Sequence, residues 1–360
     1  MGLLAWVSWP VATMLWLGKW LLALCAAGAL AALSALFALQ SRLLYLPTVP
    51  GVITNRVPAE NEFAEDRSPE QLGLAYEDIY LTARDGERLH GWLIRAPRGA
   101  SSSRSSSSRS SNGRSSGMSN DGASSSKGTS ITKPGGQLVA LFLHWHGNAG
   151  NIGHRLMLAK GLADAGFDCM LVEYRGYGLS GGSPSEEAFV RDAVDVVSWA
   201  LRRDDVQRER LFVLGASLGG AVAIGLAHRL EAEGRTGDIR GLVLENTFTS
   251  IPSLVEDMLD AQARARGLRL GSELRRGLVR ALVRLDWNSA ARIQRLGHGL
   301  PTLFLSADDD EIIPRQHMVA LEAKCSSQAK LFLRFKGASH NETWSAKGYF
   351  SGIRAWVDAL

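Results

Sequence analysis

The sequence predicts an α/β protein with a mostly parallel, doubly wound sheet and an amino-terminal membrane helix. From residue 137 onward, short wholly apolar runs alternate with helical stretches, as in a sheet that helices cover on both faces. One of these runs leads into a helix through a Gly-x-Ser-x-Gly turn at Ser217. Residues 20–39 carry no charge. With 360 residues, of which 46% are hydrophobic, the chain can hold one such domain with additions.

The amino-terminal residues 1–45 are predicted to form a single-pass membrane anchor. Residues 20–39 would span about 30 Å as a helix at ~1.5 Å per residue, which matches the hydrocarbon core of a bilayer. A cleavable signal peptide is the competing interpretation, but the stretch before Gly18 is also apolar and lacks a basic start. A two-pass hairpin broken near Gly18 is a second alternative. Lys19 and Arg42 flank the helix evenly, so its orientation, and the choice between endoplasmic reticulum and plasma membrane, stay open.

The domain itself is expected over residues 75–360, after a connector at 46–74 that is rich in Pro, Asn and charge. It begins with a β-hairpin at a sheet edge, because residues 75–82 alternate in polarity, residues 84–87 supply a turn and residues 88–94 can pair back. Residues 98–136 are mostly Ser with Arg, Gly and Asn, and bury too little apolar surface to offset the entropy of ordering. We therefore expect a disordered insertion; a phosphorylation or docking segment is the alternative.

The rest of the domain alternates strands and helices. The predicted parallel strands are Leu138–His144, Phe167–Tyr174, Leu211–Leu214, Leu242–Glu245, Thr302–Ser306 and Lys330–Phe335. The predicted helices are Gly153–Ala165, Ser185–Arg202, Leu218–Glu231, Pro314–Ala323 and a last one that ends at Leu360. This alternation implies right-handed crossovers and hence a doubly wound sheet.

Residues 247–300 separate two predicted strands and have a helical periodicity of their own, so we expect an inserted helical lid there. Ser272 is expected to cap a helix with one apolar and one basic stripe. The stripes are Leu274, Leu278, Ala281, Leu282 and Leu285 on one side and Arg276, Arg280 and Arg284 on the other. In one interpretation the leucines pack over the cleft and the arginines face water. In the other, the basic face lies against anionic lipid headgroups.

The candidate catalytic residues follow the predicted strands, where ligands bind in open α/β sheets. Ser217 lies in Gly215–Gly220, on a sharp strand-to-helix turn that would strain its backbone and expose it beside free helix N–H groups. His340 follows the last strand, and three aspartates, 308–310, follow the strand before it. Serine, aspartate and histidine in this order suit a catalytic triad, in which the histidine takes the serine proton and a carboxylate orients it. The residues alone do not decide which aspartate acts.

Composition and spacing argue against other kinds of site. The net charge is +4, but the basic residues are dispersed and no nucleic-acid motif accompanies them, so we expect no nucleic-acid partner. Cys25, Cys169 and Cys325 lie far apart and indicate no disulfide framework or zinc site. His144 and His146 lack a nearby third ligand and are expected to be structural. We expect no metal and no organic cofactor.

Five motifs in this order resemble the alpha/beta hydrolase domain-containing group that includes the fungal BEM-type membrane hydrolases. They occupy residues 143–155, 173–182, 215–220, 245–250 and 339–344. The resemblance runs from about residue 75 to the end and implies the α/β-hydrolase fold, with one amino-terminal membrane segment. In this group the acid precedes a polar residue, two aliphatic residues and a proline, which here selects Asp310. The resemblance also implies an oxyanion hole made by the backbone N–H groups of Asn148 and Leu218. The insertion at 98–136 and the triple aspartate depart from the group's pattern.

These observations predict a membrane-anchored serine hydrolase that cleaves an acyl ester or thioester, carried by a lipid or an acylated protein. Ser217 would form an acyl-enzyme, His340 would transfer the proton and Asp310 would orient the histidine. The rival hypothesis is a catalytically silent scaffold that keeps the fold and the membrane anchor. Asn341-Glu-Thr343 is formally a glycosylation acceptor, but we expect it to be unmodified because a glycan would obstruct the cleft beside His340.

Overall fold

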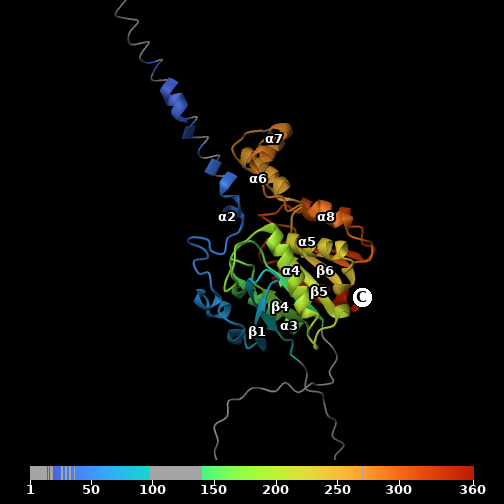
Figure 1. Ribbon diagram of the computed structural model, residues 1–360. Helices are drawn as coiled ribbons and strands as arrows, with labels where there is room; N and C mark the ends of the chain where they lie inside the picture. Colours follow the sequence, from blue (N-terminus) through green and yellow to red (C-terminus); the bar gives the residue numbers. More distant parts are fainter. Residues whose placement is uncertain are drawn as a thin grey trace, which may run out of the picture.

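The structure of the protein, a computed structural model, describes residues 37–97, 140–269 and 271–360 (Figure 1). Before residue 37 it describes residues 14, 16, 19–25, 27, 28, 31, 34 and 35. The insertion predicted over 98–136 lies outside the described residues, as do several residues of the membrane helix predicted over 20–39. Among the residues that are described, no helix combines the length and the apolar character needed to cross a bilayer.

In the described part of the chain, eight strands form one sheet in the order β1-β2-β4-β3-β5-β6-β7-β8. They are β1 Tyr76–Thr82, β2 Arg88–Ile94, β3 Leu141–Trp145, β4 Asp168–Val172, β5 Leu211–Ala216, β6 Gly241–Glu245, β7 Thr302–Ala307 and β8 Lys330–Phe335. Strand β2 runs antiparallel to β1 and to β4, and all other neighbours are parallel. The predicted mostly parallel sheet with a hairpin at its edge is confirmed.

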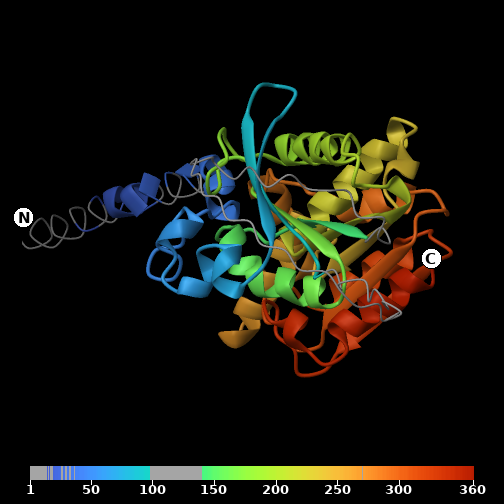
Figure 2. The same ribbon diagram turned by 90° about the horizontal axis from the view of Figure 1, so that it is seen from below.

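Helices cover both faces of the sheet, as Figure 2 shows. On one face lie α4 Glu186–Ala200, α5 Leu218–Ala232 and α9 Gln316–Lys324, and on the other lie α3 Leu156–Asp164 and α10 Tyr349–Asp358. Successive side chains of a strand point to opposite faces, so Leu143 of β3 packs into the first core and Phe142 into the second. Because both faces are buried, β3 to β7 are almost wholly apolar, which is the pattern visible in the sequence.

Three further helices follow β6 and occupy the segment predicted as a lid. They are α6 Ile251–Ala265, α7 Ser272–Leu282 and α8 Ser289–Arg295. In Figure 1, α6 and α7 stand away from the sheet near the amino-terminal helix, whereas α8 lies over the domain. The amino-terminal cap of α7 is Gly271, so the expected cap at Ser272 is wrong by one residue.

The apolar stripe predicted for α7 does not pack over the cleft. Leu274 is 55% exposed and Leu278 is 41% exposed, while Val279 is buried. The reason is that α7 packs against α6 through another face, where Arg275 forms an ion pair with Asp260 of α6 at 2.7 Å. The expectation that these leucines cover the site is therefore wrong, and the exposed surface of α7 carries leucines as well as arginines.

The residues predicted as a connector, 46–74, pack along the domain. Helix α2 (Gln40–Leu44) leads into them, and Tyr45 is only 3% exposed, with its ring 5.1 Å from that of Phe189. Asn61 is buried and exchanges side-chain hydrogen bonds with Asn151. The 3₁₀ turns here are Pro58–Glu60, Ala64–Asp66 and Pro69–Leu72, and those elsewhere are Ile152–Arg155, Arg208–Arg210, Thr236–Asp238 and Thr343–Ser345.

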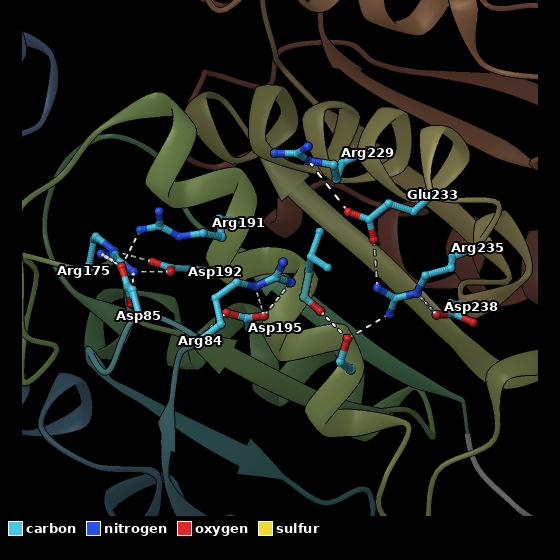
Figure 3. Close-up of polar contacts among 12 residues, drawn as sticks. Arg84, Asp85, Arg175, Arg191, Asp192, Asp195, Arg229, Glu233, Arg235 and Asp238 are labelled. Carbon is cyan, nitrogen blue, oxygen red and sulfur yellow. Dashed lines mark hydrogen bonds and ion pairs between the residues drawn. The ribbon is translucent and has the colours of Figure 1, made fainter.

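Ion pairs hold the β1–β2 turn against α4 (Figure 3). The Arg175 guanidinium lies 2.9 Å from the Asp85 carboxylate in the turn and also contacts Asp192 on α4. Arg84 pairs with Asp195, one turn further along the same helix, at 2.7 Å. The hydrogen bond from Arg175 lowers the pKa of the Asp85 carboxyl. The arginine of the motif at 173–182 thus fixes the edge hairpin and does not reach the candidate catalytic residues.

Candidate active site

The backbone around Ser217 is held in a strained turn between β5 and α5. Ser217 has φ 55° and ψ −117°, a conformation that residues other than glycine rarely adopt. A Cβ atom on Gly215 would lie 2.1 Å from the carbonyl oxygen of Gly219, and one on Gly219 would lie 1.9 Å from that of Trp145. Neither position can therefore hold a side chain. The glycines of the Gly-x-Ser-x-Gly pattern allow this close approach of strand, turn and helix.

His340 is paired with a buried carboxylate. Its Nδ1 lies 2.7 Å from Oδ2 of Asp310, and the whole residue is 7% exposed. The other Asp310 oxygen accepts hydrogen bonds from the backbone N–H groups of Ile312 and Ile313. The backbone N–H of His340 donates to Glu311 at 3.0 Å. The histidine is thus fixed at its main chain and at Nδ1, which leaves Nε2 for another partner.

The three consecutive aspartates have different surroundings. Asp308 lies 3.0 Å from Arg334 on β8, and this hydrogen-bonded pairing lowers its pKa. Asp309 is exposed, and its backbone N–H donates to Ala338. Within the described residues, Asp310 is the one of the three whose carboxylate contacts His340.

Ser217 and His340 line the same cavity, of about 40 Å³, at the carboxyl edge of the sheet. Its walls are His144, Gly147, His154, Arg155, Leu158, Ala216, Ser217, Glu245, Asn246, His340, Asn341 and Trp344. No hydrogen bond joins the two side chains in the described structure, and such bonds often shorten only when substrate binds. A larger depression, of about 590 Å³, is lined by Ala140 and Phe212 near the amino ends of their strands and contains none of the candidate residues.

Asn148 follows β3 directly after Gly147, which lines the cavity with Ser217, whereas Asn148 and Leu218 are not among the residues that line it. Its carbonyl oxygen accepts hydrogen bonds from the Tyr177 hydroxyl at 2.8 Å and from the backbone N–H of Leu46 at 2.9 Å. Its side-chain amide donates to the carbonyl of Leu44. Within the described residues, the backbone N–H groups of Asn148 and of Leu218, the first residue of α5, donate no hydrogen bond. Free N–H groups at a helix start favour a negative charge.

Asn246 was not singled out from the sequence, although it directly follows β6. Its φ is 42°, and asparagine is among the residues that tolerate this region. Its side-chain amide donates to the His340 carbonyl at 3.0 Å and to the Thr343 hydroxyl at 2.7 Å, and its oxygen accepts from the N–H of Ala307. Asn246 therefore ties the ends of β6 and β7 to the histidine loop.

A buried carboxyl supports the loop that carries Asn148. One oxygen of Glu173 accepts from the N–H of Ile152 at 3.1 Å, and the other lies 3.5 Å from Nε2 of His146. Burial raises the pKa of Glu173 to about 7. Burial lowers the pKa of His144 well below its usual value, so this histidine is neutral. Among the described residues, no three His, Cys, Asp or Glu side chains are grouped so as to hold a metal ion.

Comparisons with known proteins relate the chain to the alpha/beta hydrolases. The family model Hydrolase_4, described as serine aminopeptidase S33, matches residues 136–276. Alpha/beta hydrolase domain-containing protein WAV2 of Arabidopsis thaliana is 30% identical over 322 residues, which cover 88% of this chain and 86% of WAV2. Protein bem46 of Schizosaccharomyces pombe is 30% identical over 325 residues, or 90% of this chain and 87% of bem46.

Two further similarities are more limited. Lysophosphatidylserine lipase ABHD12 of Danio rerio is 32% identical over 189 residues, which cover 49% of this chain and 44% of that protein. The esterase Pf2001 of Pyrococcus furiosus superposes with a TM-score of 0.56 over 81% of this chain and 94% of the esterase. At 15% sequence identity, this second likeness shows the fold alone.

Proposed function

Because the chain belongs to the alpha/beta hydrolase superfamily, in the group of WAV2 and bem46, we propose that it is a serine hydrolase with the triad Ser217, Asp310 and His340. The observation that carries the proposal is that Ser217, on a positive-φ turn, and His340, bonded to Asp310, line one cavity. The resemblance of the five motifs to the group that includes the fungal BEM-type membrane hydrolases is confirmed by these relatives.

The proposed reaction has two steps. Nε2 of His340 takes the hydroxyl proton as Oγ of Ser217 attacks the acyl carbon, and Asp310 stabilises the resulting imidazolium through Nδ1. The same Nε2 then donates its proton to the departing alcohol or thiol, which leaves an acyl-enzyme. Water, activated by His340, releases the acid. The N–H groups of Asn148 and Leu218 would stabilise the negative oxygen of each tetrahedral intermediate, because neither has another partner within the described residues.

We assign the substrate to the acyl esters and thioesters, with a lipid ester as the favoured member. The name of ABHD12, a lysophosphatidylserine lipase, supports this choice. The amino-terminal segment supports it too, because its described residues include exposed Trp20, Leu21, Leu22 and Leu24. Such a surface is unfavourable in water and suits a membrane anchor. We therefore propose that residues 20–39 anchor the protein in a membrane.

The α6–α7 hairpin would provide a second contact with the bilayer. The side chain of Gln40 in α2 bonds to the carbonyl of Leu282 and accepts from the N–H of Arg284, so the end of α7 lies beside the amino-terminal helix. The hairpin presents exposed apolar side chains at Met258, Leu268, Leu274 and Leu278. Exposed arginines at 276, 280 and 284 accompany them and would contribute ~1 kcal/mol each near anionic headgroups.

A fluorophosphonate probe tests the proposal against the silent scaffold. Labelling of the full-length protein, and its loss in Ser217→Ala, would support the enzyme. The Thr249→Ala variant is a matched control, because this hydroxyl bonds to His317 and lies outside the cavity. A parent protein that stays unlabelled while correctly folded would favour the scaffold.

A further inference from the structure

The chain that leaves the amino-terminal helix is hydrogen-bonded to the loop of Asn148. The N–H of Leu46 donates to the Asn148 carbonyl at 2.9 Å, and the Asn148 side chain donates to the Leu44 carbonyl at 2.9 Å. The N–H of Gly150 donates back to the Leu46 carbonyl at 3.0 Å, so Leu46 and Ala149 form a short parallel bridge. The end of α2 and the extended residues Tyr45 and Leu46 are thus bonded to this loop, with one β-bridge at Leu46.

Tyr45 fixes the segment 44–46 to the domain core. Its backbone is extended, so its side chain points away from the loop that its neighbours contact. The ring packs edge-on against Phe189 at 5.1 Å, and its hydroxyl accepts a hydrogen bond from the indole N–H of Trp287 at 3.1 Å. Because this side chain is buried, the backbone carbonyl of Leu44 and the backbone N–H of Leu46 have a fixed position relative to the Asn148 loop.

Asn148 lies between two glycines, and glycine backbone is intrinsically the most flexible, so bonds from outside the loop help to set the direction of its N–H. Gly147 and Gly150 flank it, and Gly150 has φ 82°. An oxyanion donor must lie about 2.7–3.1 Å from the oxygen it stabilises, and a displacement of about 1 Å can cost roughly 100-fold in rate. The carbonyl oxygen and the side-chain NH₂ group of Asn148 are both engaged, whereas its backbone N–H donates no hydrogen bond within the described structure.

We propose that residues Leu44–Leu46 are a positioning element for catalysis, which holds the Asn148 N–H in the oxyanion hole. The inference rests on the proposed function, since it presupposes that the N–H of Asn148 stabilises the oxyanion. Helix α2 connects these residues directly to the apolar amino-terminal segment. Through α2, the proposed membrane anchor at residues 20–39 and the residues that would align the oxyanion hole are adjacent in the chain.

The test uses full-length protein and Leu46→Pro, which removes the N–H that donates to Asn148. Proline suits this site because Tyr45 is already extended, as the residue before a proline prefers. Leu46→Ala is the matched control, because it keeps the N–H and changes only the side chain. With p-nitrophenyl butyrate, we expect Leu46→Pro to lower kcat about 10- to 100-fold at an unchanged KM, relative to the control.

A trifluoromethyl ketone, which forms a tetrahedral adduct with an active serine, provides a second measurement. Its affinity should fall by the same factor as kcat in Leu46→Pro. A purely structural effect would instead lower the fraction of folded enzyme and leave the affinity of that fraction unchanged. If Leu46→Pro does not fold, the Asn148→Ala variant tests the proposal instead. It removes the side-chain bond to the Leu44 carbonyl and keeps the backbone N–H of residue 148. We expect the same joint loss of kcat and adduct affinity, several-fold in size.

The outcomes separate this inference from the proposed function. Equal kcat and equal adduct affinity in Leu46→Pro and Leu46→Ala would overturn the positioning element while leaving the triad intact. If Leu46→Pro does not fold, parental kcat and adduct affinity in Asn148→Ala would overturn it likewise. Activity that survives in Ser217→Ala would overturn the triad, and the inference with it.

Discussion

The polar side chains that hold His340 at the carboxyl edge of the sheet are buried and hydrogen-bonded, whereas several apolar side chains on the α6–α7 hairpin are exposed to solvent. Asp310 bonds to His340 and to two backbone N–H groups of its own loop, and the Asn246 side chain bonds to the His340 carbonyl, the Thr343 hydroxyl and the Ala307 N–H. On α7, the buried apolar residue is Val279. The two regions are neighbours along the sequence, since the hairpin begins six residues after β6 ends.

The difference matches two tasks: catalytic groups must be held rigidly, and a membrane-contacting surface must expose apolar side chains. Proton transfer requires fixed donors and acceptors, and buried side chains held by hydrogen bonds, such as His340 on Asp310, provide them. Exposed leucines are unfavourable in water and gain about 1.5–3 kcal/mol each when fully buried in an apolar phase. The carboxyl edge therefore suits chemistry, and the hairpin suits contact with a lipid surface.

The largest expected effect concerns the fixed region. Asp310→Asn should lower kcat by about 10⁴, as in triads generally, because the amide favours the wrong histidine tautomer. Asp308→Asn is the matched control: its carboxylate pairs with Arg334 on the surface, so kcat should stay within a few-fold of the parent. Steady-state kinetics on a soluble ester measure both. Nearly normal turnover in Asp310→Asn would contradict the assigned acid.

The second prediction concerns the buried carboxyl of Glu173 beneath the Asn148 loop. Burial raises its pKa from about 4.5 to about 7, so the folded state holds a proton that the unfolded state has lost between these pH values. The free energy of unfolding should therefore fall as the pH rises through this range, by roughly 2–3 kcal/mol.

Glu173→Gln removes this titration. Its free energy of unfolding should fall less than that of the parent between pH 5 and pH 8, and urea unfolding at the two pH values measures the difference. An equal pH dependence in parent and variant would show that Glu173 is ionised in the folded protein throughout.

The smallest expected effect concerns the hairpin. Leu274→Ser combined with Leu278→Ser should leave the melting temperature and the hydrolysis of a soluble short-chain ester unchanged, because both side chains are exposed. Hydrolysis of an ester embedded in phosphatidylserine vesicles should slow about ten-fold, since less apolar surface enters the bilayer. A double variant that is destabilised, or that is equally active on vesicles, would show that the leucines face protein or water.

The strands and the nucleophile turn could be predicted because their causes are local. Buried parallel strands are apolar throughout, and the turn at Ser217 requires glycine at 215 and 219 since no side chain fits there. The leucine stripe of α7 gave a wrong orientation for the opposite reason. Periodicity identifies the apolar face of a helix, but the position of α6 determined that the face with Val279 and Arg275 is the one that packs.

The sequence by itself determined the class of fold, the strained turn at Ser217 and the order of serine, acid and histidine. Three identical side chains in a row left the acid open, and Asp310 was selected only through the family resemblance. The tertiary structure shows that Asp308 points to Arg334 and Asp310 to His340. It also decided that Asn246 and Leu46 support the site. Their partners lie 94 and 102 residues away in the chain, and no local pattern encodes a hydrogen bond across that separation.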